Sequence, residues 1–169
     1  MARPTTGEYG SFYQTYINYT QADSIHALIH QHADNILQSI QAIPAEKADY
    51  AYAPGKWTIK QMLQHMLDTE RIFVYRLIWI ARGDKRALMG FDENAFADAA
   101  PATHRSLTDL VKEFTHLRNS TDVLMQSLQD TDLQQISEAS GYPISVNALC
   151  YIIYGHNLHH LRILSERYL

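Results

Sequence analysis

The sequence contains very little cysteine, glycine or proline. Among its 169 residues there are one cysteine (Cys150), seven glycines and five prolines. A single cysteine excludes an internal disulfide and any zinc site built from several cysteines, and we expect Cys150 to pack as a small apolar side chain. The scarcity of helix-breaking residues leaves room for long, uninterrupted helices.

Charged residues are also scarce, and no block of like charges occurs. They make up 19% of the chain, against about 25% in typical globular proteins, and the formal net charge is −4. Because a phosphate backbone attracts basic surfaces, we expect no nucleic-acid partner. A small-molecule substrate is the partner that we expect. The hydrophobic fraction of 46% is ordinary for a folded protein and argues against disorder.

The sequence has no hydrophobic run of the length that a membrane span requires, about 18 residues. The longest apolar stretch, residues 72–81, is interrupted by Arg76. The first residues, MARPTTGEYGSF, have no apolar run after their arginine, which argues against a secretory signal. We therefore expect a cytoplasmic protein without membrane contact, folded as a single domain over residues 1–169.

Four stretches show the hydrophobic periodicity of amphipathic helices. They cover about residues 23–42, 58–82, 106–128 and 145–168. Asp23 and Ser106 are candidate N-caps, and Thr58 with Gln61 forms a possible capping box. Because strand-like alternation is nearly absent, the pattern predicts an all-α protein, a four-helix bundle.

Three segments lie outside these helices. Residues 83–102 are long for a bundle connection, and we expect them to cross the bundle or to fold as a lid. Residues 129–144 are expected to form a loop with at most one helical turn. The start of the chain is rich in tyrosine and is expected to pack on the bundle (Tyr9, Tyr13, Tyr16 and Tyr19).

Nine histidines are an unusually large number, and two of them occupy the apolar stripe of the last helix. At about 100° per residue, His156 and His160 fall within about 20° of Leu149. Burying two imidazoles costs free energy unless their nitrogens find partners. In one interpretation, the two histidines pack in the core and form hydrogen bonds with neighbouring residues. We prefer a second interpretation, in which the i, i+4 pair binds one transition metal.

The other histidines are less informative. His65 lies one step off the apolar stripe of the second helix, so its pattern fits a third metal ligand and an interface residue equally well. His32 falls in the apolar stripe of the first helix and either lines a site or packs in the core. His159 lies at the edge of the apolar stripe of the last helix. The remaining histidines are expected to face solvent: His26, His30, His104 and His116.

Glu70 and Arg76 also interrupt the apolar stripe of the second helix. A buried carboxylate needs a partner, and Arg76 or a histidine could provide it. The pair could be an ion pair that holds the bundle together. Alternatively, both residues could support catalysis by orienting a ligand or the substrate.

Known catalytic patterns are incomplete in this sequence. The segment from His156 to His160 has the outline of the zinc-protease motif HExxH, but Asn157 replaces the glutamate that would act as the base. Di-iron bundles need two ExxH motifs, and Glu113 with His116 supplies only one, which faces outward. No Ser–His–Asp elbow or phosphate-binding glycine loop is present.

Two long segments resemble the DinB-like (DNA-damage-inducible) superfamily. They are PGKWTIKQMLQHMLDTERIFVYRL (Pro54–Leu77) and SVNALCYIIYGHNLHHLRIL (Ser145–Leu164), and GDKRALMGFDENAF resembles a connection found in one branch. The resemblance implies a four-helix bundle with a long crossover between its second and third helices, and frequent homodimers. It also implies one divalent metal ion, zinc or nickel, held by His65, His156 and His160.

The resemblance also implies an enzyme. Some members are transferases or isomerases that use low-molecular-weight thiols such as bacillithiol or mycothiol, which favours transfer of a thiol to an electrophile. Others are described as hydrolases, so metal-dependent hydrolysis is the alternative. A non-catalytic metal-binding or ligand-binding stress protein, and a structural dimer with core histidines, are further hypotheses. Many relatives carry a glutamate where this chain has Asn157, so no acid–base role is assigned to this position.

Overall fold

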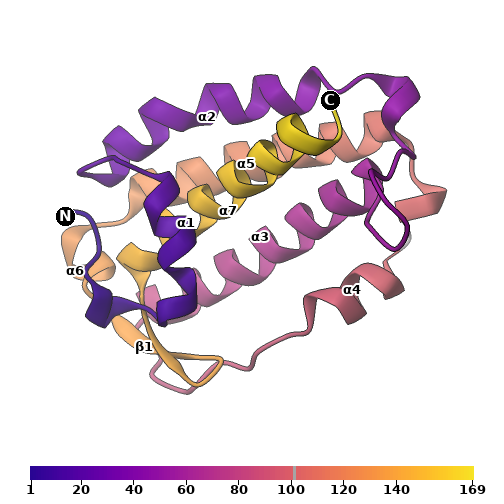
Figure 1. Ribbon diagram of the computed structural model, residues 1–169. Coiled ribbons are helices and arrows are strands. Elements are labelled where there is room, and N and C mark those ends of the chain that lie inside the picture. Colours follow the sequence, from indigo (N-terminus) through magenta and orange to yellow (C-terminus); the bar gives the residue numbers. More distant parts are fainter. Residues whose placement is uncertain (101) are drawn as a thin grey trace.

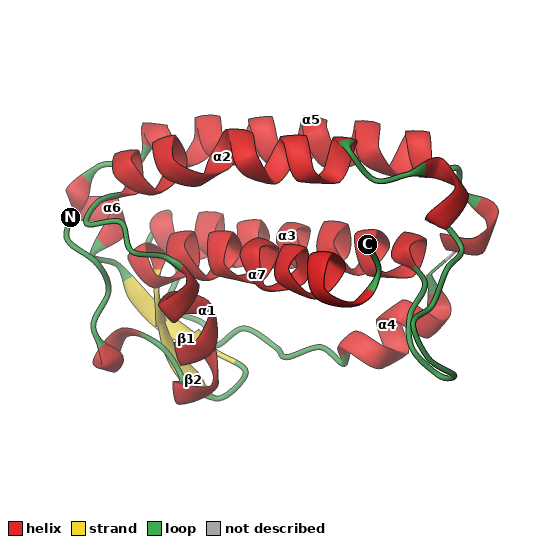
Figure 2. Ribbon diagram, turned by 45° about the horizontal axis from the view of Figure 1, so that its top comes forward, coloured by secondary structure: helices red, strands yellow, loops and turns green. Residues whose placement is uncertain are grey.

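Four long helices form the bundle in the computed structural model, which describes residues 1–100 and 102–169. They are α2 (Ile25–Gln41), α3 (Ile59–Ala81), α5 (Leu107–Ser127) and α7 (Val146–Arg167). Their ends lie within two residues of the predicted ones. Figure 2 shows α2 with α5 in one layer and α3 with α7 in the other. The predicted four-helix bundle is confirmed.

Each long helix begins at a hydroxyl side chain that caps it. The hydroxyl of Thr58 accepts a hydrogen bond from the backbone N–H of Gln61, whose side chain completes the predicted capping box. Ser106 and Ser145 cap α5 and α7 in the same way. The cap of α2 is Ser24 and not the predicted Asp23. Such caps each contribute about 1 kcal/mol and fix where the helices start.

The tyrosine-rich start packs on the bundle, as predicted. Two short 3-10 turns (Thr6–Glu8 and Ser11–Tyr13) lead into α1 (Gln14–Tyr19), which lies against α7 (Figure 1). Gly155 permits this contact, because a Cβ atom there would overlap the backbone carbonyl of Tyr16. The close approach brings the α1 tyrosines next to the histidines of α7.

The long connection between α3 and α5 crosses beside α3. It contains α4 (Glu93–Ala99) and a 3-10 turn (Ala102–His104), and α4 packs on α3 (Figure 1). The backbone of Leu88 forms hydrogen bonds with Glu138 (2.9 Å) and Ser140 (3.0 Å). These bonds tie the crossover to the segment that precedes α7.

That preceding segment was predicted as a loop, and this prediction is wrong. After the short helix α6 (Asp130–Leu133), strands β1 (Ile136–Ala139) and β2 (Tyr142–Ser145) form an antiparallel hairpin. Its turn residues, Ser140 and Gly141, both have positive φ values, 56° and 82°. A two-residue turn of this kind matches the twist of the paired strands. Proline is rare inside strands, so the proline in β2 makes this hairpin difficult to predict from the sequence.

The core centres on α7, in which every residue from Val146 to Asn157 is buried. Cys150 is among them, as expected. Because α7 contacts α1, α2 and α3, several of its polar residues, such as Asn147 and His156, lie inside the protein. Among the described residues, no helix has the length and apolar character needed to cross a membrane.

Candidate metal centre

Three histidines from two helices converge inside the bundle. The Nε2 atom of His156 lies 3.1 Å from Nε2 of His65 and 3.1 Å from Nε2 of His160. One nitrogen of each ring lies within 4.8 Å of the other two, and all three side chains are buried. Ligand nitrogens of a tetrahedral metal site with bonds of about 2.0 Å are separated by about 3.3 Å. The cluster therefore has the dimensions of a three-histidine metal site.

Burial keeps these rings neutral. It lowers the pKa of His65 to about 4, with a smaller contribution from His159. Burial, followed by the neighbouring histidines, holds the pKa values of His156 and His160 well below the usual range. Thr69 Oγ1 lies 3.4 Å from Nδ1 of His65 and helps to orient that ring. At neutral pH the histidines can therefore present nitrogen lone pairs to a cation.

The sequence explains how the cluster forms. His156 and His160 are one helical turn apart on α7, so they share a face. His65 lies on α3, which packs along α7 and supplies the third nitrogen. The structure therefore brings together the three side chains that the resemblance predicted.

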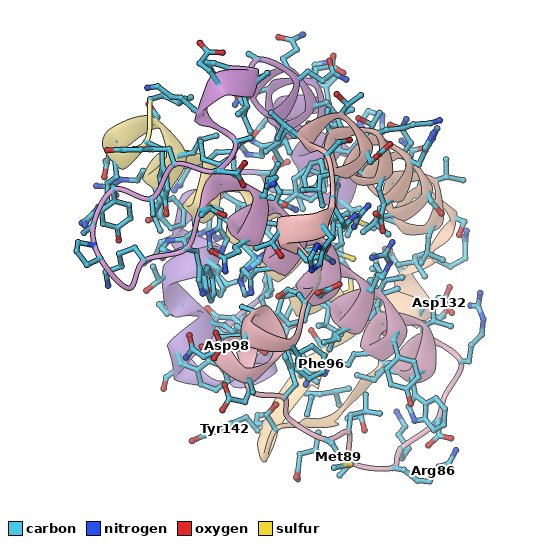
Figure 3. All side chains as sticks on the ribbon, turned by 90° about the vertical axis from the view of Figure 1, so that its right-hand side faces the viewer. Arg86, Met89, Phe96, Asp98, Asp132 and Tyr142 are labelled. Carbon is cyan, nitrogen blue, oxygen red and sulfur yellow. The ribbon has the colours of Figure 1, made fainter. Side chains whose placement is uncertain are left out.

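A cavity of about 560 Å³ opens onto the three histidines, and its walls are largely aromatic. The Trp57 ring lies against His65, with 4.8 Å between ring centroids. Tyr16 and Phe73 approach His156 edge-on, at 5.4 and 6.0 Å. This volume lies in the usual range for small-molecule sites. The crossover contributes Phe91 and Glu93 to the walls, and the hairpin contributes Ser140. Figure 3 labels Met89 and Tyr142, two exposed residues of these same segments that lie outside the cavity lining.

The family model of the DinB superfamily matches residues 28–164. The chain belongs to the DinB superfamily. A relative from Geobacillus thermodenitrificans (strain NG80-2) is named "Putative metal-dependent hydrolase" and is 25% identical over 146 residues, covering 83% of this chain and 81% of the relative.

The fold of this DinB-superfamily protein is also found among solved structures. YfiT from Bacillus subtilis is described as "a probable metal-dependent hydrolase with an unusual four-helix bundle topology". Its structure superposes with a TM-score of 0.66 at 18% sequence identity, covering 97% of this chain and 91% of YfiT. This similarity supports the fold, since the identity is too low to transfer an activity.

Glu70 is buried in this DinB protein, but neither predicted partner contacts it. Its carboxylate accepts hydrogen bonds from Arg118 (2.9 Å), Thr121 (2.7 Å) and Asn157 (3.0 Å). The predicted pairing of Glu70 with Arg76 or a histidine is therefore wrong. Because Asn157 directly follows His156, its bond to Glu70 links the histidine-bearing helix to α3.

Sequence reasoning missed Arg118, which is the centre of this buried network. It pairs with Glu70 and with Asp122, and its guanidinium lies 4.5 Å from the centroid of the Tyr154 ring. Burial disfavours its charge, but the two carboxylates outweigh burial and raise its pKa. The only available signal was its spacing, four residues after the buried Phe114 on α5. The network is structural, since it does not line the cavity.

Arg76 holds the crossover and the hairpin against α3. Its Nη2 atom donates to the carbonyl of Met89 (2.7 Å) and to Oγ of Ser140 (3.3 Å), and Nη1 donates to the Tyr13 hydroxyl (3.5 Å). Unlike Glu70, Arg76 lines the cavity. It therefore lies in the same cavity as the three histidines.

The other six histidines lie in three different settings. His159 is half-buried, lines the cavity, and has its Nδ1 atom 3.4 Å from the Tyr19 hydroxyl. His32 packs near Tyr154, with 6.3 Å between ring centroids, and does not reach the cavity. The histidines expected at the surface are exposed, as predicted: His26, His30, His104 and His116.

Proposed function

We propose that this protein is a metal-dependent enzyme in which His65, His156 and His160 bind one divalent cation and a small-molecule substrate occupies the aromatic cavity. The observation that carries the proposal is the approach of three neutral Nε2 atoms, 3.1 Å apart in two pairs, at a cavity wall. Three imidazoles suit zinc or nickel and leave a coordination position open, as catalytic sites do.

The proposed reaction is metal-assisted hydrolysis, in keeping with the names of the two relatives. A divalent cation at this position polarises a carbonyl group and lowers the pKa of a water or thiol. The chain's own residues shape the surroundings. Trp57 packs against the His65 ring and Tyr16 approaches the His156 ring, so both place aromatic surface beside the histidine cluster. Asn157 and Glu70 support α7 from behind and so hold His156 and His160 in place.

Transfer of a low-molecular-weight thiol to an electrophile is the second candidate. It is favoured because, in the described residues, no carboxylate joins the three histidines in their cluster. Asn157 occupies the position next to His156, and the Glu70 carboxylate accepts hydrogen bonds from Arg118, Thr121 and Asn157. Among the described residues that line the cavity, Glu93 is the one carboxylate. A thiol, with a usual pKa of about 8.5, ionises far more readily than water and needs less help from a base.

A rate comparison separates these reactions. Protein loaded with zinc or nickel would be assayed with p-nitrophenyl esters, and with a low-molecular-weight thiol plus chloro-dinitrobenzene. His160→Ala removes one proposed ligand, and His116→Ala is the matched control because His116 is exposed and outside the cavity. Faster ester hydrolysis, lost only in His160→Ala, supports hydrolysis, and faster thiol transfer supports the second candidate. Equal rates in all three proteins would refute an enzymatic role for the cluster on these substrates.

We further propose that the protein forms a homodimer, as the family resemblance implies. Sedimentation equilibrium should give about twice the chain mass of 19.4 kDa. A mass equal to one chain at micromolar concentration would contradict the proposal.

A further inference from the structure

Arg76 is a buried cation that forms no ion pair within the part of the chain that the structure describes. Its exposed fraction is 2%, and its three acceptors are a backbone carbonyl, a serine hydroxyl and a tyrosine hydroxyl. In residues 1–100 and 102–169, no carboxylate oxygen lies within 4.0 Å of its nitrogens. Buried arginines are normally paired with an anion, as Arg118 is here.

The guanidinium of Arg76 has unused hydrogen-bonding capacity beside the cavity. An arginine has five N–H donors, and the observed acceptors account for three of them at most. The Phe73 and Phe91 rings lie near the guanidinium, with 5.9 and 6.0 Å between Cζ and the ring centroids. The three hydrogen bonds and these aromatic neighbours restrict the group, so less ordering is needed when it binds an anion.

The position of Arg76 relative to the histidines limits the length of a ligand that reaches both. The Phe73 centroid is 5.9 Å from Cζ of Arg76 and 6.0 Å from the centroid of His156. The guanidinium and the His156 ring are therefore no more than about 12 Å apart. A small molecule in the cavity can contact both groups at once.

We infer that Arg76 binds a carboxylate group of the substrate and orients it so that its reacting group points toward the three histidines. The inference deepens the proposed function, since it assumes that the substrate occupies this cavity. A carboxylate matches the charges better than a phosphate dianion does. Among the described lining residues Arg76 is the one permanent cation, and Glu93 adds a negative charge that would repel a dianion. A planar carboxylate also fits the fork of guanidinium donors.

Ligand binding to the metal-free protein tests this inference without involving metal ligation. Calorimetric titration would compare 4-phenylbutyrate with its neutral amide in the wild type, Arg76→Gln and Arg82→Gln. Arg82 is the matched control because it is exposed, follows α3 and does not line the cavity. We expect the wild type and Arg82→Gln to bind the carboxylate about tenfold more tightly than the amide, as a charge-assisted hydrogen bond provides. Arg76→Gln should lose this preference.

Equal binding of acid and amide by the wild type, or an unchanged preference in Arg76→Gln, would overturn the inference. Tighter binding of phenyl phosphate than of 4-phenylbutyrate would overturn the assignment to a carboxylate. If Arg76→Gln does not fold, nuclear magnetic resonance of the wild type provides the test. The Arg76 Nε–H signal, identified by its loss in Arg76→Lys, should shift saturably with 4-phenylbutyrate, and an unmoved signal would refute the contact. A failed metal-binding assay would leave these results unaffected, so the two proposals can fail separately.

Discussion

Replacing Gly155 with alanine tests the contact that places α1 beside the candidate metal centre. A Cβ atom at position 155 would overlap the Tyr16 carbonyl oxygen and lie 2.5 Å from the carbonyl carbon. Carbon atoms in contact are normally about 3.5 Å apart, so α1 would have to move by about 1 Å. The obstacle is backbone, and no side-chain rotation can relieve it.

Two opposing effects determine how much Gly155→Ala changes the free energy of unfolding. Overpacking of this kind costs about 1–3 kcal/mol, while alanine is favoured over glycine inside a helix by up to about 1 kcal/mol. The clash should dominate, because α1 packs closely against α7 and a shift of α1 would disturb that packing. We expect a net destabilisation of about 1–2 kcal/mol, which lowers Tm by about 2–8 °C for a chain of this size.

Thermal unfolding followed by circular dichroism provides the assay. Gly7→Ala is the matched control, because a Cβ atom there would have no neighbour within 4 Å. The Tyr16 ring contacts His156 and His159, so Gly155→Ala should also weaken ligand binding in the cavity. A Gly155→Ala protein as stable as the wild type would show that α1 does not make this contact.

Two further predictions concern buried groups. Glu70→Ala leaves Arg118 without one of its two carboxylates and should destabilise the fold by about 3 kcal/mol. The control Glu166→Ala breaks an exposed pair with Arg162 and should cost less than about 1 kcal/mol. Equal urea midpoints for the two variants would contradict this prediction. Burial raises the pKa of Cys150 to about 12, so the native protein should not react with Ellman's reagent at pH 8 and the unfolded protein should. Rapid labelling of the native thiol would refute its burial.

The sequence predicts those parts of the fold that depend on local patterns. The four helices follow from apolar periodicity, and their first residues follow from hydroxyl caps. Asp23 and Ser24 can both cap a helix, so the sequence cannot choose between them. His156 and His160 are recognisable from their i, i+4 spacing. His65 is not recognisable from pattern alone, because its role depends on how α3 packs against α7, and here the family resemblance supplied it.

The features that were missed depend on contacts between distant segments. The partner of Glu70 is Arg118 on α5, 48 residues away, and nothing in the α3 pattern indicates it. Arg76 donates to a backbone carbonyl of the crossover and to the turn of an unpredicted hairpin. That turn has positive φ at Ser140, a residue that is less typical of such turns than asparagine or glycine. The partners of Glu70 and Arg76 therefore depend on tertiary packing, and the hairpin depends on an unusual turn residue.

Metal analysis of the purified protein tests the central claim most directly. Protein made without a histidine tag would be incubated with zinc or nickel, desalted and measured by plasma mass spectrometry. The account predicts one metal ion per chain in the wild type and in His30→Ala, whose histidine is exposed, and almost none in His156→Ala. A wild-type protein without bound metal, or a His156→Ala variant that retains the full amount, would contradict it.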